Sequence, residues 1–288
     1  MRLSSLCSRS GFLAVAVASL VLGPASRAQS GSANAPAQPQ QQQPGKPAAQ
    51  NAPAQPQEVA KKDPEEEKAY AAFNATNGRD ADKVIQLGEQ FLQKYPNSSY
   101  AEVTYSRLTQ AYFNKGQDDK MYASADKALA LNPDDVSVLS LVGWVIPHSY
   151  NPNDIEAERR LNRAETYEKH ALEVLPAMPT PPNLTDAQFA SAKLDAASRA
   201  HSGLGLIYYW RQQFPDSVRE LQEALQDEGA SPDATDLYVM GVGLQTTKRF
   251  GEAADAFQKC AQIASGLQDR CKQGAETARK QAASQPKN

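Results

Sequence analysis

The feature that most constrains this sequence is a pattern of 36 residues that occurs twice between residues 197 and 264. When the two copies are aligned on Phe214 and Phe250, small residues face small ones and large apolar residues face large apolar ones, as with Gly205 and Gly241. In each copy, apolar and small residues recur at helical spacing, stop at a turn and then resume. Such a repeat predicts two amphipathic helices back to back, and therefore an array of helical hairpins.

This pattern resembles the tetratricopeptide repeat (TPR), a helix-turn-helix unit of about 34 residues. The resemblance implies an all-α fold, a TPR-type α-solenoid of about five helical hairpins with a C-terminal capping helix. The junction from Phe91 to Ala101 is similar to those of exported, periplasmic bacterial TPR proteins. The expected repeats lie at about 65–97, 102–135, 136–178, 198–231 and 234–267, with the cap at 268–283.

The third expected repeat has more residues between its two helices than the family pattern allows. The family pattern allows about nine residues from Ile146 to Ala164, and this chain uses eighteen. The surplus is predicted to form a loop at 147–154. A loop inserted into a solenoid often takes part in binding, and a harmless extension is an equal alternative.

A long helix is expected from about Ala187 to Gln213, after a connector that is rich in proline. Thr185 or Asp186 is a natural N-cap for it. Because this helix exceeds the length of one repeat helix, its first half is expected to pack on the preceding repeat, in place of a missing hairpin.

The first 28 residues have the pattern of a secretory signal peptide, with a positive start, an apolar run and small residues before the expected cleavage after Ala28. Lipid anchoring is the weaker alternative, because no cysteine follows the apolar run at a lipoprotein-type position. Residues 29–60 consist mainly of Gln, Pro, Ala, Asn and Gly, which predicts a disordered linker. The helical domain is expected to span 61–285.

The charge balance argues against two classes of partner. The chain has 30 basic and 33 acidic residues, and loss of Arg2, Arg9 and Arg27 with the signal would leave a formal charge of −6. Nucleic acids and anionic membranes both favour a basic patch. After the signal, no apolar run is long enough to span a membrane. We therefore expect an exported protein, periplasmic or secreted, whose partners are other proteins of the envelope or other exported proteins.

Two cysteines follow the signal, Cys260 and Cys271. On one straight helix they would lie about 16 Å apart, too far for a bond. A helix end at Ser265 and Gly266 would let them meet, so a disulfide that ties the cap to the last repeat and a pair of free thiols are equal alternatives. No histidine lies near either cysteine at the spacing of metal ligands.

The sequence gives little support for an enzyme. Its three histidines, His148, His170 and His201, are scattered and belong to no paired metal motif or nucleophile pattern. The glycine pairs near 203–205 and 241–243 lie inside expected helices and lack the third glycine of a dinucleotide loop. We therefore expect no catalytic activity, no metal and no cofactor.

The resemblance also implies a binding surface, because the first helix of each TPR hairpin lines a concave groove. Carried over by approximate alignment, the groove positions are aromatic and polar, with few charges, which suits an extended or helical peptide. The alternative for each residue is a place in the core. The expected groove residues are Phe73, Gln110, Phe113, Trp144, His148, Tyr209, Trp210 and Tyr238.

Two functions remain from this sequence. In the first, the chain is a non-catalytic protein–protein interaction scaffold of the bacterial cell envelope, which binds peptide segments of partner proteins in an aromatic-lined groove. In the second, it is a periplasmic, chaperone-like binder of extended client chains. A defined stoichiometric partner would favour the first, and weak binding to many unfolded sequences would favour the second.

Overall fold

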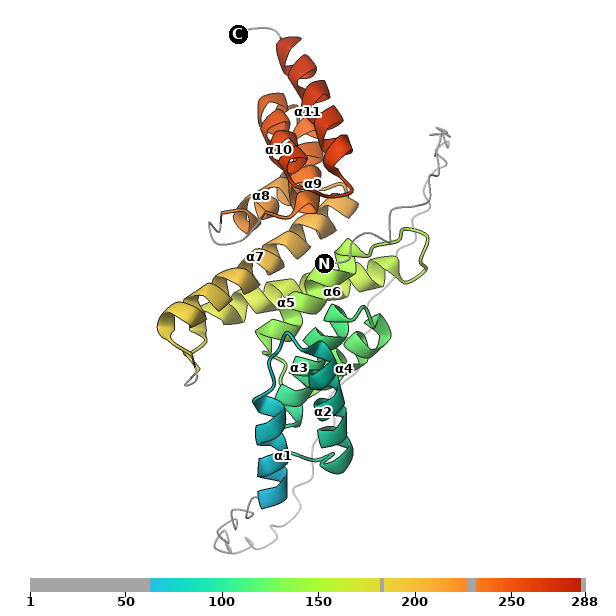
Figure 1. Cartoon of the computed structure of the whole chain (residues 1–288). Coiled ribbons are helices and arrows are strands. Elements are labelled where there is room, and N and C mark those ends of the chain that lie inside the picture. Colours follow the sequence, from blue (N-terminus) through green and yellow to red (C-terminus); the bar gives the residue numbers. More distant parts are fainter. Residues whose placement is uncertain (1–62, 182–183, 227–231, 286–288) are drawn as a thin grey trace, which may run out of the picture. The chain divides into compact units, whose positions relative to one another are not determined.

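The computed structural model describes residues 63–181, 184–226 and 232–285, and within these ranges every regular element is a helix (Figure 1). The expected signal peptide, with its cleavage after Ala28, and the expected linker at 29–60 lie outside the described residues. The helices are α1 (Pro64–Asn74), α2 (Ala81–Lys94), α3 (Ala101–Asn114), α4 (Asp118–Leu131), α5 (Val136–His148), α6 (Ala157–Val174), the short 3-10 helix η1 (Leu175–Ala177), α7 (Asp186–Trp210), α8 (Phe214–Ala224), α9 (Ala234–Thr246), α10 (Phe250–Gln262) and α11 (Gln268–Ala283).

The helices form five consecutive pairs, α1–α2, α3–α4, α5–α6, α7–α8 and α9–α10, and α11 packs on the last pair. The main packing of each pair is within itself and against the pair next to it in the chain. This arrangement confirms the predicted all-α array of about five hairpins with a capping helix. Its stability is therefore expected to be approximately a sum of hairpin and neighbour terms.

Polar side chains set the starts of several helices. Thr185 forms a capping box with Gln188 at the start of α7, which satisfies two backbone N–H groups that the helix itself leaves free. A side-chain cap of this kind stabilises a helix by about 1 kcal/mol. Aspartates cap four other helices through hydrogen bonds to backbone N–H groups, namely Asp63, Asp80, Asp135 and Asp233.

The repeat of 36 residues reappears as a repeated contact. A Cβ atom at Gly205 of α7 would lie 2.5 Å from Cγ of Leu221 in α8, and one at Gly241 of α9 would lie 2.7 Å from the ring of Phe257 in α10. Both members of each pair differ by 36 residues from their counterparts. The glycine therefore leaves a slot in the first helix, and a large apolar side chain of the second helix fills it.

The hairpin turns repeat as well. Gln212 and Lys248 end the turns before α8 and α10 with φ angles of 60° and 63°, and Gly116 takes the same left-handed conformation between α3 and α4 with φ of 64°. A left-handed conformation costs a residue other than glycine about 1–2 kcal/mol. Two of these three turns therefore carry backbone strain that the third avoids.

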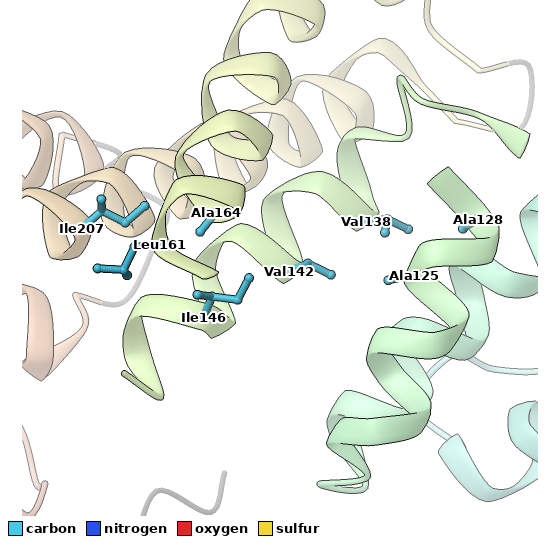
Figure 2. Close-up of a cluster of buried hydrophobic side chains, with 8 residues drawn as sticks. All are labelled: Ala125, Ala128, Val138, Val142, Ile146, Leu161, Ala164 and Ile207. Atoms are coloured by element: carbon cyan, nitrogen blue, oxygen red, sulfur yellow. The ribbon is translucent and has the colours of Figure 1, made fainter. Parts of the chain in front are cut away.

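The core continues from one hairpin into the next. Figure 2 shows one of its clusters, which joins four successive helices through side chains that are at most 5% exposed. The members are Ala125 and Ala128 of α4, Val138, Val142 and Ile146 of α5, Leu161 and Ala164 of α6, and Ile207 of α7. This cluster holds α5 and α7 in fixed register, which matters for the surface described below.

Helix α7 has the expected excess length. Its first half contributes Ala196 and Ala197 to a cluster with Leu139 of α5 and Ala171 of α6, so it packs on the third hairpin. Its second half pairs with α8. The long helix thus packs on the third hairpin with its first half and on α8 with its second half.

The inserted loop begins later than predicted. Pro147 and His148 form the end of α5, and the connection to α6 consists of residues 149–156. A proline in the last turn removes one helical hydrogen bond there and leaves the earlier turns intact, so the helix extends through it.

The chain turns back after α10, and Cys260 of α10 and Cys271 of α11 are joined by a disulfide with their Cα atoms 5.7 Å apart. Both cysteines are fully buried, among residues of α9 such as Leu237. The bond ties the terminal helix to the last hairpin. Thiol labelling of the protein under oxidising conditions tests this bond.

Within the described residues, no helix combines the length and apolar character that a membrane span needs.

Candidate functional site

At the C-terminal ends of the first helices, a set of aromatic side chains lies in two groups that a hydrogen bond from Trp210 to the Pro147 carbonyl oxygen joins. We call it the aromatic strip, and its members are Phe113 of α3, Trp144 and His148 of α5, Tyr150 of the inserted loop, and Tyr209 and Trp210 of α7. Five of these six residues belong to the groove that the sequence predicted. Three helices that lie far apart in the sequence thus contribute to one surface.

The α5 half of the aromatic strip is a stack. The indole of Trp144 lies 3.9 Å from the imidazole of His148, centroid to centroid, and meets the ring of Phe113 edge-on at 6.1 Å. His148 Nδ1 lies 2.7 Å from the carbonyl oxygen of Trp144. Since a carbonyl only accepts, Nδ1 carries the proton and the buried Nε2 is left as an acceptor with no partner among the described residues. Burial lowers the pKa of His148, so its ring is neutral at pH 7.

The α7 half is anchored by Trp210. Its indole Nε1–H donates to the carbonyl oxygen of Pro147 at 2.9 Å, which joins the end of α7 to the end of α5. The ring lies 4.8 Å from Tyr150 and 5.2 Å from Tyr209. Because both ends of the indole are held by protein contacts, its orientation is fixed before any ligand arrives.

Exposure of the aromatic strip is graded. Trp210 is 38% exposed, while Phe113, Trp144 and Tyr209 are half-buried. The indole N–H of Trp144 donates to no group of the described chain. The surface thus offers apolar ring area together with an unused hydrogen-bond donor.

Phe73 was wrongly placed in the groove. Its side chain is 0% exposed, within a cluster that includes Val84 and Ala111, and the guanidinium of Arg107 covers its ring at 4.5 Å. A ligand cannot reach it. The helical spacing that suggested a groove position is the same spacing that fills the core of the first hairpin.

Gln110 and Tyr238 lie beside the aromatic strip without belonging to it. Gln110 is exposed one turn before Phe113, and its side-chain amide donates to Asn114. Tyr238 is half-buried in α9 and packs with Tyr209 on the same small core cluster. Their role in binding stays a prediction.

The sequence did not single out Tyr150 as a binding residue. The feature of the sequence that could have indicated Tyr150 is its place among the extra residues between α5 and α6. In the structure these residues bring the Tyr150 ring against Trp210. The insertion therefore extends the aromatic strip.

Two buried carboxyl groups lie in the helices behind the aromatic strip. Glu168 of α6 is 0% exposed, and neither carboxyl oxygen has a hydrogen-bond partner in the described chain. Burial raises the pKa of Glu168 well above its usual range, against the attraction of the Arg199 guanidinium. Burial likewise raises the pKa of Asp236, which accepts a hydrogen bond from Ser202, to about 7.

The described ranges hold no group of three or more His, Cys, Asp or Glu side chains that could bind a metal ion. Glu168 and Asp236 are buried inside helix contacts, where a substrate has no access. The accessible chemistry of this surface is that of rings and hydrogen-bond donors, which suits binding.

No protein-family model matches this sequence, and no curated protein matches it either. Among solved structures, TTC0263, a thermophilic TPR protein of Thermus thermophilus, is similar at 16% identity over 74% of this chain and 95% of that chain, with a TM-score of 0.44. PilW, a widely conserved type IV pilus biogenesis factor, is similar at 16% identity over 77% of this chain and 92% of that chain, with a TM-score of 0.49. The chain's own geometry defines the fold. With the five helix pairs and the repeated glycine contacts, the described chain is an array of helical hairpins.

Proposed function

We propose that this protein is a non-catalytic interaction scaffold that binds peptide segments of partner proteins on the aromatic strip. The observation that carries the proposal is the presence of two groups of ring contacts, from Phe113 through Trp144 to His148 and from Tyr150 through Trp210 to Tyr209. The hydrogen bond from the Trp210 indole to the Pro147 carbonyl oxygen joins the two groups. Rigid, partly exposed aromatic side chains are the usual anchors of protein interfaces.

The chemistry of the aromatic strip favours an uncharged ligand segment. Its six members include no Lys, Arg, Asp or Glu, and His148 is neutral because burial lowers its pKa. The free N–H of Trp144 can donate to a backbone carbonyl of the ligand, and the rings can cover its apolar side chains. A peptide main chain with apolar side chains meets both requirements.

The proposed location is the bacterial cell envelope, which rests on the signal-like residues 1–28 of the sequence. N-terminal sequencing of the exported protein tests this part separately. A mature N-terminus at Gln29 is expected, and an intact Met1 would contradict export with cleavage.

The test of binding is crosslinking in cells followed by mass spectrometry, with Trp210→Ala compared with wild type. Trp210 is 38% exposed, so its removal exposes little core, and Leu131→Ala on α4, 56% exposed, is a matched control away from the aromatic strip. We expect one dominant envelope partner to be lost in Trp210→Ala and kept in Leu131→Ala. Unchanged partners in both variants would contradict the proposal, and a diffuse set of clients would favour the chaperone-like alternative.

A further inference from the structure

The insertion between α5 and α6 has a second consequence, a cleft between the second helices of two neighbouring hairpins. A cavity of about 300 Å³ lies between α4 and α6, lined by Tyr122, Ile146, Arg159, Arg160 and Arg163. A smaller cavity shares Tyr122, Ile146 and Arg160 and reaches the inserted loop at Asp154. The two cavities form one cleft with an apolar and aromatic floor and a wall of arginines.

The three arginines differ in the ion pairs and hydrogen bonds that their guanidinium groups make. Arg159 is ion-paired with Glu156, and Arg163 with Asp126. Arg160, whose side chain is 58% exposed, is ion-paired with Asp154 at 3.6 Å, a distance too long for a hydrogen bond, and its guanidinium donates to no group of the described chain. The guanidinium of Arg160 therefore makes the weakest of the three ion pairs, and its N–H donors can bind a planar anion such as a carboxylate.

The loop at the mouth of the cleft presents an apolar side chain. Asn151 Oδ1 accepts from Asn153 N–H, and Asp154 Oδ1 accepts from Glu156 N–H, each at 3.0 Å, so side chains fix the turns of the loop. Ile155 sits between these turns and is 97% exposed. A hydrogen-bonded loop thus holds a large apolar side chain in water.

We propose that this cleft binds a segment of a partner protein in which acidic and apolar residues are interleaved. A carboxylate of the segment pairs with the guanidinium of Arg160, and a neighbouring apolar side chain lies on Tyr122 and Ile146. Ile155 covers the segment from the mouth of the cleft. Binding removes the exposed isoleucine from water, which a free anion would leave exposed.

The charges around the cleft select a short acidic segment over a polyanion. Asp126, Asp154 and Glu156 already offset much of the positive charge of the three arginines. Such a balanced cluster exerts little long-range attraction on a nucleic acid, whose binding depends on neutralising several phosphates. The single guanidinium of Arg160, whose pair with Asp154 is long, can bind one or two carboxylates.

The experiment measures the fluorescence anisotropy of a labelled ten-residue peptide with alternating Glu and Leu, titrated with the full chain. The Gln–Leu counterpart is the peptide control. Arg219→Ala is the matched protein control, since the Arg219 side chain is 59% exposed against 58% for Arg160. Arg160→Ala should weaken binding about tenfold or more, the usual effect of losing a charge-assisted hydrogen bond, whereas Arg219→Ala should not change it.

Two further measurements sharpen the result. We expect Ile155→Ser to weaken binding of the Glu–Leu peptide severalfold, and added salt to weaken it as well. Equal binding of the Gln–Leu peptide, or equal loss in Arg160→Ala and Arg219→Ala, would overturn the proposal. The proposal would also be overturned if millimolar phosphate displaced the peptide fully and Ile155→Ser left binding unchanged. Tighter binding of oligo-deoxythymidine than of the peptide would overturn it as well.

Discussion

Two regions of this array solve the same packing problem with different chemistry. In the last two hairpins, the slots left by Gly205 and Gly241 are filled by the apolar side chains of Leu221 and Phe257. In the junction of α5, α6 and α7, the slots left by Gly143 and Gly203 both face the carboxyl group of Glu168, since a Cβ atom at either glycine would overlap with it.

The difference shows that a helix glycine fixes how closely two helices approach without fixing what lies between them. An apolar filling gains free energy from burial at any pH. A buried carboxyl group fills the same space well only while it is protonated, because an unpaired buried charge is costly. The contribution of the Glu168 slot should therefore depend on pH, whereas the contributions of the apolar slots filled by Leu221 and Phe257 should not.

The largest expected effect concerns the apolar slot. Phe257 fills the spaces beside Gly241 and Gly274, so Phe257→Ala leaves a cavity between three helices and should lower the free energy of unfolding by about 3–5 kcal/mol. Leu131→Ala, at an exposed position, should change it by at most about 0.5 kcal/mol. Urea denaturation measures both, and similar values for the two would contradict the claim that Phe257 fills the space beside the two glycines.

The next effect is the pH dependence of stability, which distinguishes a slot filled by a carboxyl group from a slot filled by an apolar side chain. The raised pKa of Glu168 means that its protonated form is favoured by folding, so its contribution is complete below the ordinary glutamate pKa and is lost as the pH rises towards the raised value. Glu168→Gln cannot ionise. We expect the free energy of unfolding of Glu168→Gln to rise relative to that of wild type as the pH increases above the ordinary glutamate pKa, because only the wild-type carboxyl group must stay protonated in the folded state.

Two controls accompany this measurement. The free energy of unfolding of Asp236→Asn should also rise relative to that of wild type as the pH increases. This difference should level off above pH 7, because the pKa of Asp236 is raised to about 7. Phe257→Leu should differ from wild type by an amount that does not vary with pH. A difference between Glu168→Gln and wild type that is constant from pH 5 to pH 7 would show that Glu168 is charged in the folded state.

A smaller effect tests the close approach at Gly205. Gly205→Ala places a methyl group 2.5 Å from Leu221, and overpacking of this kind should cost about 1–3 kcal/mol. Gly251→Ala in α10 has no atom within 4 Å of the new methyl group and should stabilise the helix by up to about 1 kcal/mol. Thermal unfolding followed by circular dichroism compares them, and a normal melting curve for Gly205→Ala would count against the repeat register.

The smallest effect concerns the turns. Lys248→Gly relieves the left-handed strain at φ of 63° and should raise the free energy of unfolding by up to about 1 kcal/mol, since glycine also loses more entropy on folding. Gly116→Ala introduces the same strain into the second hairpin and should lower stability by a similar amount. Opposite signs for these two substitutions are the expected result, and equal signs would contradict the shared turn conformation.

The hairpins could be predicted from the sequence because helical spacing and turn residues are local properties. The partner of each helix face is not local. Phe73 has the spacing of a groove residue, yet the guanidinium of Arg107, from the following hairpin, covers its ring. Glu168 reads as a solvated residue of a charged helix, and only the meeting of Gly143 and Gly203 reveals the space that it occupies.

The disulfide makes the two ends of the array unequal. A helix at the end of a row of hairpins has one neighbour and is normally the first to fray, but α11 cannot leave α10 while Cys260 and Cys271 are bonded. The first hairpin, α1 and α2, has no covalent tie within the described residues. Opening should therefore travel in one direction, from α1 towards α11, and amide hydrogen exchange should slow progressively along the chain until reduction of the disulfide frees the far end as well.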